Sequence, residues 1–294
     1  MGAASVWIKA SRPKTLPAAL APVAVGTCLA AGPAGIFRLP ILLATIIGAL
    51  FIQIGTNLSN DYSDARRGAD TEERLGPVRV TAGGLVPPKQ VLYATWISFA
   101  ISALAGAYLV YEAGWELILV GAASIIAGVL YTGGPRPYGY EGLGEVFVFL
   151  FFGVVAVMGS YFVQTEQLSW EAFALSIPVG LLACSLLMVN NIRDIDTDQR
   201  AGKRTLAVRL GRAKMRTVFS ATLLLAFALV PIIWLVTDLP AWINLALLAL
   251  PLQPPLAKTV RDRTDGAALN KALADSARLE LAFCVLLSVG LLVA

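Results

Sequence analysis

Long apolar stretches recur along the entire chain, and each approaches the length that a helix needs to cross a lipid bilayer. Roughly 20 apolar residues span the hydrocarbon core as an α-helix. Such stretches occupy residues 16–34, 39–60, 91–111, 115–132, 143–163, 172–191, 217–237, 240–257 and 279–293, the last being the shortest. Charged residues make up only 14% of the 294 positions, against about 25% in a soluble domain. The sequence therefore predicts an all-α fold, a polytopic membrane bundle of about nine transmembrane helices.

Positive charge predicts how this bundle sits in the membrane. With the N-terminus in the cytoplasm, all of the 23 Lys and Arg residues except Arg38 fall in inward-facing segments. So strong a bias follows the rule that cytoplasmic loops are rich in Lys and Arg. The two long loops, 61–90 and 192–216, also face inward. We therefore expect a multi-pass plasma-membrane protein that works at its cytoplasmic side, with one domain over residues 1–294.

Two residue types limit the chemistry that the chain can perform. Histidine is absent, which removes the usual general base and a common nitrogen ligand of metals. Cys28, Cys184 and Cys284 lie inside apolar stretches without paired spacing, so neither a disulfide nor a zinc site is expected. Any bound metal must take oxygen ligands.

Two polar motifs close the second and the sixth predicted spans. The amide and two carboxylates of each motif share one helix face: Asn57, Asp61 and Asp64 in the first, and Asn190, Asp194 and Asp198 in the second. Asp196 points elsewhere on this reading. Four spans separate the motifs, so both lie on the same side of the membrane, as in parallel repeats.

These oxygen-rich motifs suit Mg²⁺, which binds through a few carboxylates together with substrate phosphates. Metal ions held between the two motifs would clamp a diphosphate leaving group. Unpaired carboxylates near the membrane core cost about 2.5–3.5 kcal/mol each on insertion scales, so we expect a cation or a function to compensate them. A single motif would be explained as a solvated helix end. Two on one side favour a metal site, with all six polar residues as ligands and the four aspartates as the catalytic groups.

Other candidate residues surround the motifs. Lys203 and Arg204 follow the second motif and are expected to bind phosphate oxygens, although inward loops are basic in any case. Arg136 is the cation of the Gly/Pro-rich loop 131–140. Tyr131 opens that loop and either faces a carbocation, a contact worth about 0.5–2 kcal/mol, or belongs to the interfacial aromatic belt. Lys14 either anchors the first span or reaches an anionic acceptor.

The order of the motifs resembles the UbiA superfamily of intramembrane prenyltransferases, over nearly the whole chain. Within it, the similarity is greatest to the 1,4-dihydroxy-2-naphthoate polyprenyltransferases. The matching segments are Arg12-Pro-Lys-Thr-Leu-Pro17, Gly68-Ala-Asp70-Thr71, Thr81-Ala-Gly-Gly84, Tyr131-Thr-Gly-Gly-Pro135, Gly142-Leu-Gly-Glu145, Asn190-Asn-Ile-Arg-Asp194 and Gly202-Lys-Arg-Thr-Leu-Ala-Val-Arg-Leu-Gly211.

This resemblance implies a central cavity open to the cytoplasmic side, in which the two motifs hold Mg²⁺ and a polyprenyl diphosphate, with Arg66 joining Lys203 and Arg204 at the phosphates. It implies prenyl transfer to the naphthoate with loss of CO₂ and diphosphate, giving demethylmenaquinol. Because CO₂ leaves where other members remove a proton, the lack of histidine is no obstacle. The expected partners are the two substrates and membrane lipid, with no nucleic acid and no obligate protein partner.

Other interpretations remain open at the level of the sequence. Another UbiA-type enzyme would use 4-hydroxybenzoate, homogentisate or a sugar phosphate as its acceptor. A cation-coupled transporter would place acidic residues near the membrane mid-plane and often contains inverted repeats. A purely structural membrane scaffold leaves the paired acidic motifs unexplained.

Overall fold

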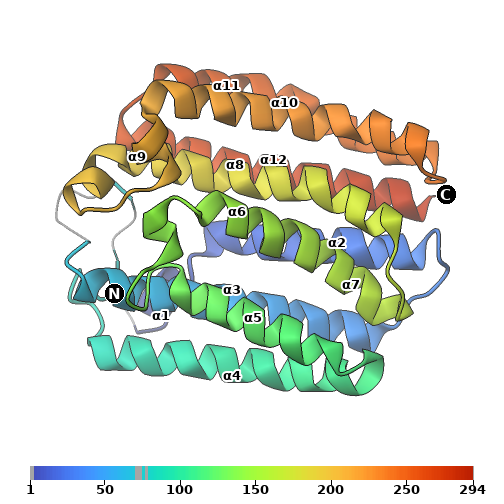
Figure 1. Cartoon of the computed structure of the whole chain (residues 1–294), viewed down its shortest axis with the longest axis horizontal. Helices are drawn as coiled ribbons and strands as arrows, with labels where there is room; N and C mark the ends of the chain where they lie inside the picture. Colours follow the sequence, from blue (N-terminus) through green and yellow to red (C-terminus); the bar gives the residue numbers. More distant parts are fainter. Residues whose placement is uncertain (1–2, 70–74, 77–78, 294) are drawn as a thin grey trace.

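The computed structural model describes residues 3–69, 75–76 and 79–293, and the described chain is helical apart from short connections. Its helices lie side by side in an elongated bundle (Figure 1). In chain order they are α1 (Ala3–Ser11), η1 (Pro13–Thr15), α2 (Leu16–Ala31), α3 (Leu39–Arg66), α4 (Pro88–Ala113), α5 (Glu116–Leu130), η2 (Tyr138–Glu141), α6 (Gly144–Val148), η3 (Phe149–Val155), α7 (Ala156–Thr165), α8 (Trp170–Arg200), α9 (Leu206–Leu210), α10 (Arg212–Val236), η4 (Ala241–Leu252), α11 (Gln253–Asp262) and α12 (Gly266–Leu292).

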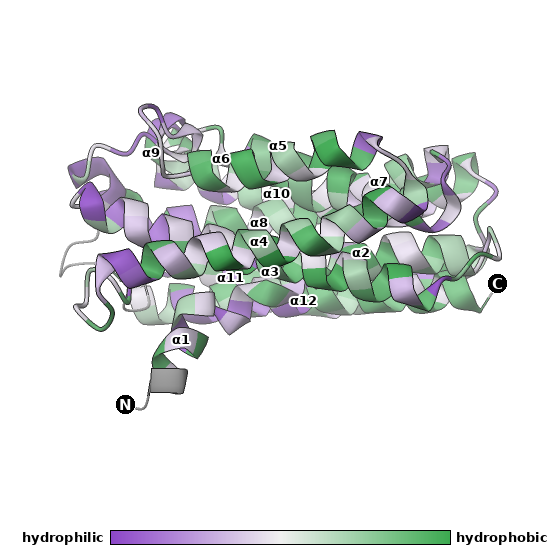
Figure 2. Cartoon of the chain, turned by 90° about the horizontal axis from the view of Figure 1, so that it is seen from below, coloured by the Kyte–Doolittle hydropathy of each residue, from purple (hydrophilic) through white to green (hydrophobic). Residues whose placement is uncertain are grey.

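The apolar stretches of the sequence become the long helices of the bundle, which confirms the predicted all-α membrane fold. Within the described residues, six helical segments are long and apolar enough to cross a membrane, and the shorter apolar helix α5 accompanies them. Apolar residues cover the sides of these helices, whereas polar residues gather at the end of the bundle that holds α9 (Figure 2).

One predicted boundary is wrong. The last span was expected to begin at residue 279, whereas α12 begins at Gly266. Its first half carries Lys271, Asp275 and Arg278, which lower the mean hydropathy of this segment without interrupting the helix. Asp265 supplies the start signal, because its carboxylate accepts the backbone N–H of Ala268 at 2.9 Å.

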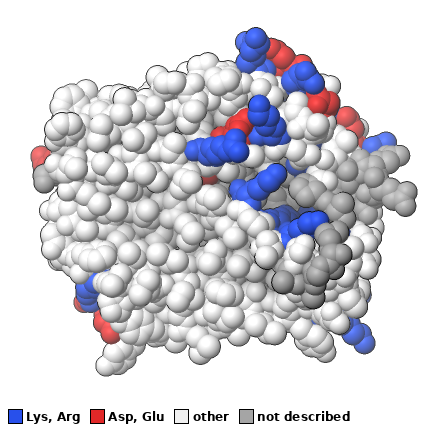
Figure 3. Space-filling view, turned by 180° about the vertical axis from the view of Figure 1, so that it is seen from behind, with Lys and Arg blue, Asp and Glu red and all other residues white. Residues whose placement is uncertain are grey.

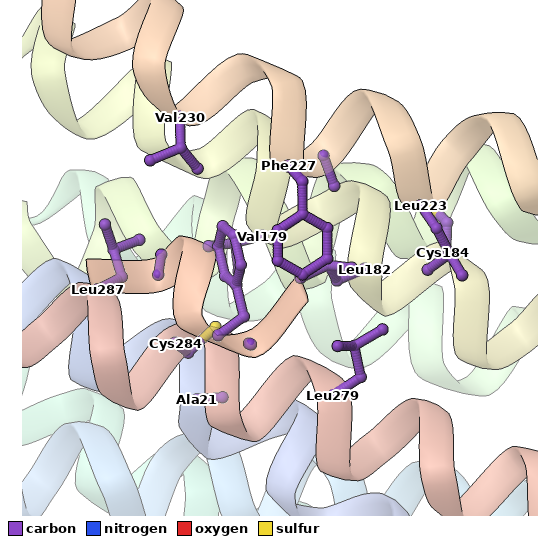
Figure 4. Close-up of a cluster of buried hydrophobic side chains, with 14 of the residues drawn as sticks. Ala21, Val179, Leu182, Cys184, Leu223, Phe227, Val230, Leu279, Cys284 and Leu287 are labelled. Atoms are coloured by element: carbon purple, nitrogen blue, oxygen red, sulfur yellow. The ribbon is translucent and has the colours of Figure 1, made fainter. Parts of the chain in front are cut away.

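The main core lies in the half of the bundle formed by α2, α8, α10 and α12. Buried side chains from these helices form one continuous cluster, part of which is drawn in Figure 4. Phe227 and Phe283 meet edge to face with ring centroids 5.3 Å apart, a favoured aromatic geometry. This packed half fixes α8, which carries the second motif.

Close helix contacts join this half to the π-helical segment η3. Gly153 on η3 faces Gly180 on α8, and a Cβ at Gly153 would approach the Cα of Gly180 to 2.7 Å. Only residues without side chains allow backbones to come so near. A π-helical turn inside a longer helix often accompanies a functional site, and Phe151 and Phe152 from η3 line the cavity described below.

Candidate active site

The C-terminal ends of α3 and α8 meet at one end of the bundle. Lys203 follows α8, and its Nζ lies 3.4 Å from an oxygen of Asp64 on α3 and 3.9 Å from an oxygen of Asp198 on α8. The structure thus brings the two motifs together around one buried cation, as expected for parallel repeats. Charged side chains also gather toward one end of the molecule in surface view, while most of the remaining face carries none (Figure 3).

Asp64 is the residue on which several elements converge. Its carboxylate is almost fully buried, accepts a hydrogen bond from the Tyr140 hydroxyl at 2.6 Å and pairs with Arg79 at 3.1 Å. With Lys203 added, two cations and one hydroxyl surround a single carboxylate. Burying a charged group is costly unless it is paired and hydrogen-bonded, and these partners compensate the burial of Asp64.

Asp61 has a different kind of partner. Its two carboxylate oxygens accept the backbone N–H groups of Val80 and Thr81 at 3.0 and 2.9 Å. These bonds hold the turn over residues 79–84, in which Gly84 has φ +66°, a conformation that favours glycine. The turn carries Arg79 to Asp64, so Asp61 positions a cation of the site through the backbone.

On α8, Arg193 connects the polar residues of the second motif. Its guanidinium forms a two-pronged pair with Asp194, at 2.7 and 2.6 Å, and donates to the amide oxygen of Asn190 at 2.8 Å. A further bond at 2.7 Å reaches Asn270 on α12, whose amide donates to the carbonyl of Leu75. Arg193 therefore compensates Asp194 and ties the second motif to the core half of the bundle.

The first motif is hydrogen-bonded in a similar manner to the bend over residues 11–15, between α1 and α2, which we call the elbow. The amide nitrogen of Asn57 donates to the carbonyl of Ser11 at 3.0 Å and to the Thr15 hydroxyl at 3.4 Å. Between them, Arg12 adopts left-handed backbone angles, φ 54° and ψ 67°, which cost energy in a residue other than glycine. This bend places Arg12 and Lys14 at the cavity.

Three tyrosines, Tyr131, Tyr138 and Tyr140, line the cavity, and Tyr140 lies next to Asp64. The Tyr140 ring lies 4.7 Å from the Nζ of Lys203, a cation–π contact. Tyr138 stacks on Phe147 with centroids 3.9 Å apart, meets Tyr131 edge to face at 5.4 Å, and donates its hydroxyl to the carbonyl of Ala127. Burial raises the pKa of Tyr138, so this hydroxyl stays protonated at physiological pH.

A cavity of about 1080 Å³ begins between these groups and continues into the bundle. Its polar end contains the motif residues, and its other walls come from the apolar faces of α3, α4, α5 and α7. Along α3 the lining extends from Asp64 to Thr45, which is about 28 Å at 1.5 Å per residue. The volume lies at the upper limit of ordinary small-molecule pockets, about 300–1,000 Å³. The space therefore suits a long apolar ligand with a charged end.

At the far end of the cavity, Arg38 connects the start of α3 to the end of α7. Its backbone N–H donates to the Gln164 side chain at 2.7 Å, its guanidinium donates to the carbonyl of Val163 at 2.7 Å and it pairs with Glu166 at 3.2 Å. The one cation that sequence analysis placed on the outward side thus joins the start of α3 to the end of α7.

Most of the site residues predicted from sequence line this cavity. They are Lys14, Asn57, Asp61, Asp64, Tyr131, Asn190, Asp194, Asp198 and Lys203. Arg66, Arg136 and Arg204 do not line it and have exposed side chains. Arg66 donates instead to the Tyr62 hydroxyl at 3.0 Å, and the Arg204 backbone N–H bonds to the carbonyl of Tyr140 at 2.8 Å. Asp70 and Thr71 of the extended first motif lie outside the described residues.

The structure adds residues that sequence analysis did not select. Arg79 and Tyr140 bind Asp64 directly, and Arg193 binds Asp194. All three occur within or beside the family-matching segments already noted, but their partners are distant in sequence or adjacent on a helix, so spacing alone gave no signal. Asp196, whose role was open, forms an ion pair with Arg212 at 2.7 Å on the surface.

The donor set fits a divalent cation that is shared with a ligand. Among the described residues no group of three or more acidic, cysteine or histidine side chains could hold a metal alone. Asp64 and Asp198 nevertheless face each other across Lys203, and all the side-chain donors are hard oxygens. Mg²⁺ characteristically binds through one or two carboxylates plus substrate phosphates. Asp64 and Asp198 are the two of the four aspartates that share the Lys203 cation, so they mark the point where the two motifs meet.

Comparison with known proteins decides the family. The sequence matches the UbiA prenyltransferase family over residues 19–284. The chain belongs to this family. Among its UbiA relatives, the 1,4-dihydroxy-2-naphthoate octaprenyltransferase of Mycobacterium tuberculosis is 43% identical over 276 residues, covering 94% of this chain and 93% of the relative. The Escherichia coli protein of the same name is 38% identical over 273 residues, covering 91% and 88%.

Solved UbiA structures share the fold. A UbiA homolog from Archaeoglobus fulgidus, solved with GPP and Mg²⁺, superposes with a TM-score of 0.67 at 14% identity, covering 96% of this chain and 99% of that one. A second homolog, from Aeropyrum pernix K1, gives a TM-score of 0.63 at 17% identity over 96% and 98% of the two chains. At such low identity the likeness concerns the arrangement of helices alone.

Proposed function

We propose that the chain transfers a polyprenyl group from polyprenyl diphosphate to 1,4-dihydroxy-2-naphthoate, releasing diphosphate and CO₂ and giving demethylmenaquinol. The observation that carries this proposal is the cavity, which joins the meeting point of the two motifs to a long apolar interior. The diphosphate fits the charged end and the prenyl chain fits the apolar walls. The naphthoate acceptor is supported by relatives with that activity in their names, at 33–43% identity.

The charged end is suited to a diphosphate that carries divalent cations. Asp64 and Asp198, with Asn57 and Asn190 beside them, would hold Mg²⁺, which supplies charge neutralisation to the leaving diphosphate when it is bound. Lys203 and Arg79 both lie beside Asp64, where they would donate charge-assisted hydrogen bonds to phosphate oxygens. Asp61 and Arg193 keep these groups in place through the contacts described above.

The reaction balances without a protein base. The allylic carbon–oxygen bond breaks and its electron pair leaves with the diphosphate. The acceptor ring carbon that bears the carboxylate forms the new bond to the allylic carbon. The bond from that ring carbon to the carboxylate then breaks, CO₂ departs, and the electron pair restores the aromatic ring. This scheme accords with a chain that has no histidine.

The walls of the cavity protect the reacting carbon. Tyr131, Tyr138 and Phe147 present aromatic surface near the motifs, where positive charge develops as the leaving group departs. The apolar lining beyond them excludes water, which would otherwise capture the carbocation. The carboxylate of the acceptor is attracted by Arg12 and Lys14 at the elbow, both of which line the cavity.

The orientation forms part of the proposal. The motif end carries almost all of the basic residues, which favours its placement in the cytoplasm of a plasma-membrane protein. In this orientation the prenyl chain enters the site from the lipid, and the diphosphate and the acceptor carboxylate approach it from the cytoplasmic water.

Product analysis tests the proposed reaction. The purified protein is incubated with Mg²⁺, octaprenyl diphosphate and one acceptor at a time, chosen from 1,4-dihydroxy-2-naphthoate, 4-hydroxybenzoate and homogentisate. Mass spectrometry is expected to find a prenylated naphthoquinol that has lost the mass of CO₂, with at least about 100-fold lower turnover for the other acceptors. Preferential prenylation of 4-hydroxybenzoate or homogentisate would assign the chain to a different reaction of the same family.

A further inference from the structure

The end of the cavity remote from the motifs is closed by a small apolar cluster. Ile41, Ala113 and Val163 are buried together, with Leu109 and Leu117 packed against them. Ile41 lies 23 residues before Asp64 on α3, about 35 Å away along the helix. Leu109, Leu117 and Val163, which also line the cavity, are called the floor below. They come from three different helices, α4, α5 and α7.

Every floor residue has a glycine one helical turn away on its own helix: Gly106 for Leu109, Gly121 for Leu117 and Gly159 for Val163. Residues three or four apart share a helix face, and all three glycines line the cavity. Counted at 1.5 Å per residue from the helix ends next to the floor, the three glycines lie about 8–10 Å inside the bundle. By this estimate they lie at about the same depth in the cavity, between the floor and the motifs, and we call the three together the glycine ring.

Neither packing nor backbone shape requires these glycines. A Cβ added at Gly106, Gly121 or Gly159 would meet no atom within 4 Å, and none of the three has a positive φ. By contrast, a Cβ at Gly26 or Gly128 would collide with the neighbouring helix. Glycine inside a helix is destabilising relative to alanine. What the ring provides in return is open space just above the floor.

We propose that the glycine ring sets the length of prenyl chain that the protein accepts, and that its space holds the last isoprene units of a long polyprenyl diphosphate. This inference rests on the proposed function. A short chain anchored by its diphosphate at Lys203 ends before it reaches the ring, whereas a long chain must pass through it to the floor. The ring therefore discriminates by length and leaves the reacting end unchanged.

Leucine substitutions test the ring directly. In Gly121→Leu and Gly159→Leu, kcat/KM for octaprenyl diphosphate is expected to fall at least tenfold, while kcat/KM for geranyl diphosphate stays within twofold of wild type. Ala123→Leu is the matched control, because Ala123 is exposed on α5 and does not line the cavity. It adds the same side chain to the same helix and is expected to change neither value. Gly121→Ala adds only a methyl group and should retain both activities.

Two outcomes would overturn the proposal: an unchanged ratio of octaprenyl to geranyl activity in the leucine variants, or an equal loss for both substrates in variants that remain folded. Folding is checked by thermal unfolding in detergent. The shift in unfolding temperature caused by each diphosphate, measured without an acceptor, compares the binding of octaprenyl and geranyl diphosphate directly. It therefore tests the ring separately from the identity of the acceptor: a wild type that binds both diphosphates but does not prenylate the naphthoate contradicts the proposed function alone.

Discussion

The Nζ of Lys203, in the connection that follows the second motif and α8, lies 3.4 Å from a carboxylate oxygen of Asp64 in the first motif on α3. Both side chains are buried, so their attraction is weakly screened by water. The contact is the most direct sign that the end of α3 and the segment after α8 act as one site.

Replacing Asp64 by asparagine keeps the shape of the side chain and removes its charge. We expect Asp64→Asn to lower kcat/KM by at least about 100-fold, because stabilisation of a reacting centre by a placed charge is worth this much in enzymes. Asp196→Asn is the matched control on α8, since Asp196 forms only an exposed ion pair with Arg212. Its activity should stay within about twofold. Similar activity in both variants would remove Asp64 from the site.

Lys203 is expected to act on the diphosphate substrate. Lys203→Met should raise the KM for prenyl diphosphate by about tenfold or more, because a charge-assisted hydrogen bond contributes about 1.5–3 kcal/mol, and Lys203→Arg should recover part of the loss. Steady-state kinetics at several diphosphate concentrations measure both. Lys271→Met, on the exposed part of α12, serves as the control. A KM unaffected in Lys203→Met would show that this cation only compensates Asp64.

Arg193 is expected to matter for folding as much as for chemistry. Its side chain is 1% exposed and is the partner of Asp194, so Arg193→Met leaves a buried charge uncompensated and should cost about 3–5 kcal/mol in the free energy of unfolding. Adding Asp194→Asn to that variant should restore part of the loss, as thermal or denaturant unfolding would measure. Arg212→Met removes a surface pair worth about 0–1 kcal/mol. If the double variant is no more stable than Arg193→Met, the two residues are not coupled.

The backbone role of Asp61 has its own signature. Asp61→Ala removes the acceptor of the Val80 and Thr81 amides, so these amides should exchange with deuterium much faster while those of α8 remain protected. Hydrogen–deuterium exchange on peptides covering residues 79–86 measures the difference. Unchanged protection of this turn would mean that other contacts hold it and that Asp61 is available to ligands.

The sequence was most informative where hydrophobicity and spacing alone determine structure. The long helices follow from the apolar stretches, and the meeting of Asp64 with the region after α8 follows from the four spans between the motifs. The start of α12 was missed because its charged residues hide an amphipathic helix from a hydropathy criterion. Its N-cap, Asp265, was a local signal that could have been used.

Side-chain partners were less predictable than helices. Arg66 and Arg204 were chosen because they lie close to the motifs in sequence, yet both face solvent. Arg66 is on the exposed side at the end of α3, and Arg204 lies in the connection between α8 and α9, where its backbone N–H is bonded to the Tyr140 carbonyl. Arg79 reaches the site only because Asp61 holds a turn in the loop, which no periodicity reveals. The size of the cavity depends on how α4, α5 and α7 pack, and this too is a tertiary property.

Metal removal tests directly whether the two motifs act together on a diphosphate through divalent cations. Turnover of octaprenyl diphosphate and 1,4-dihydroxy-2-naphthoate is measured in wild type after treatment with EDTA and again after Mg²⁺ is added back. We expect no turnover in the chelated enzyme and full recovery with Mg²⁺, with no recovery in Asp64→Asn. Undiminished turnover in the presence of excess EDTA would contradict this expectation.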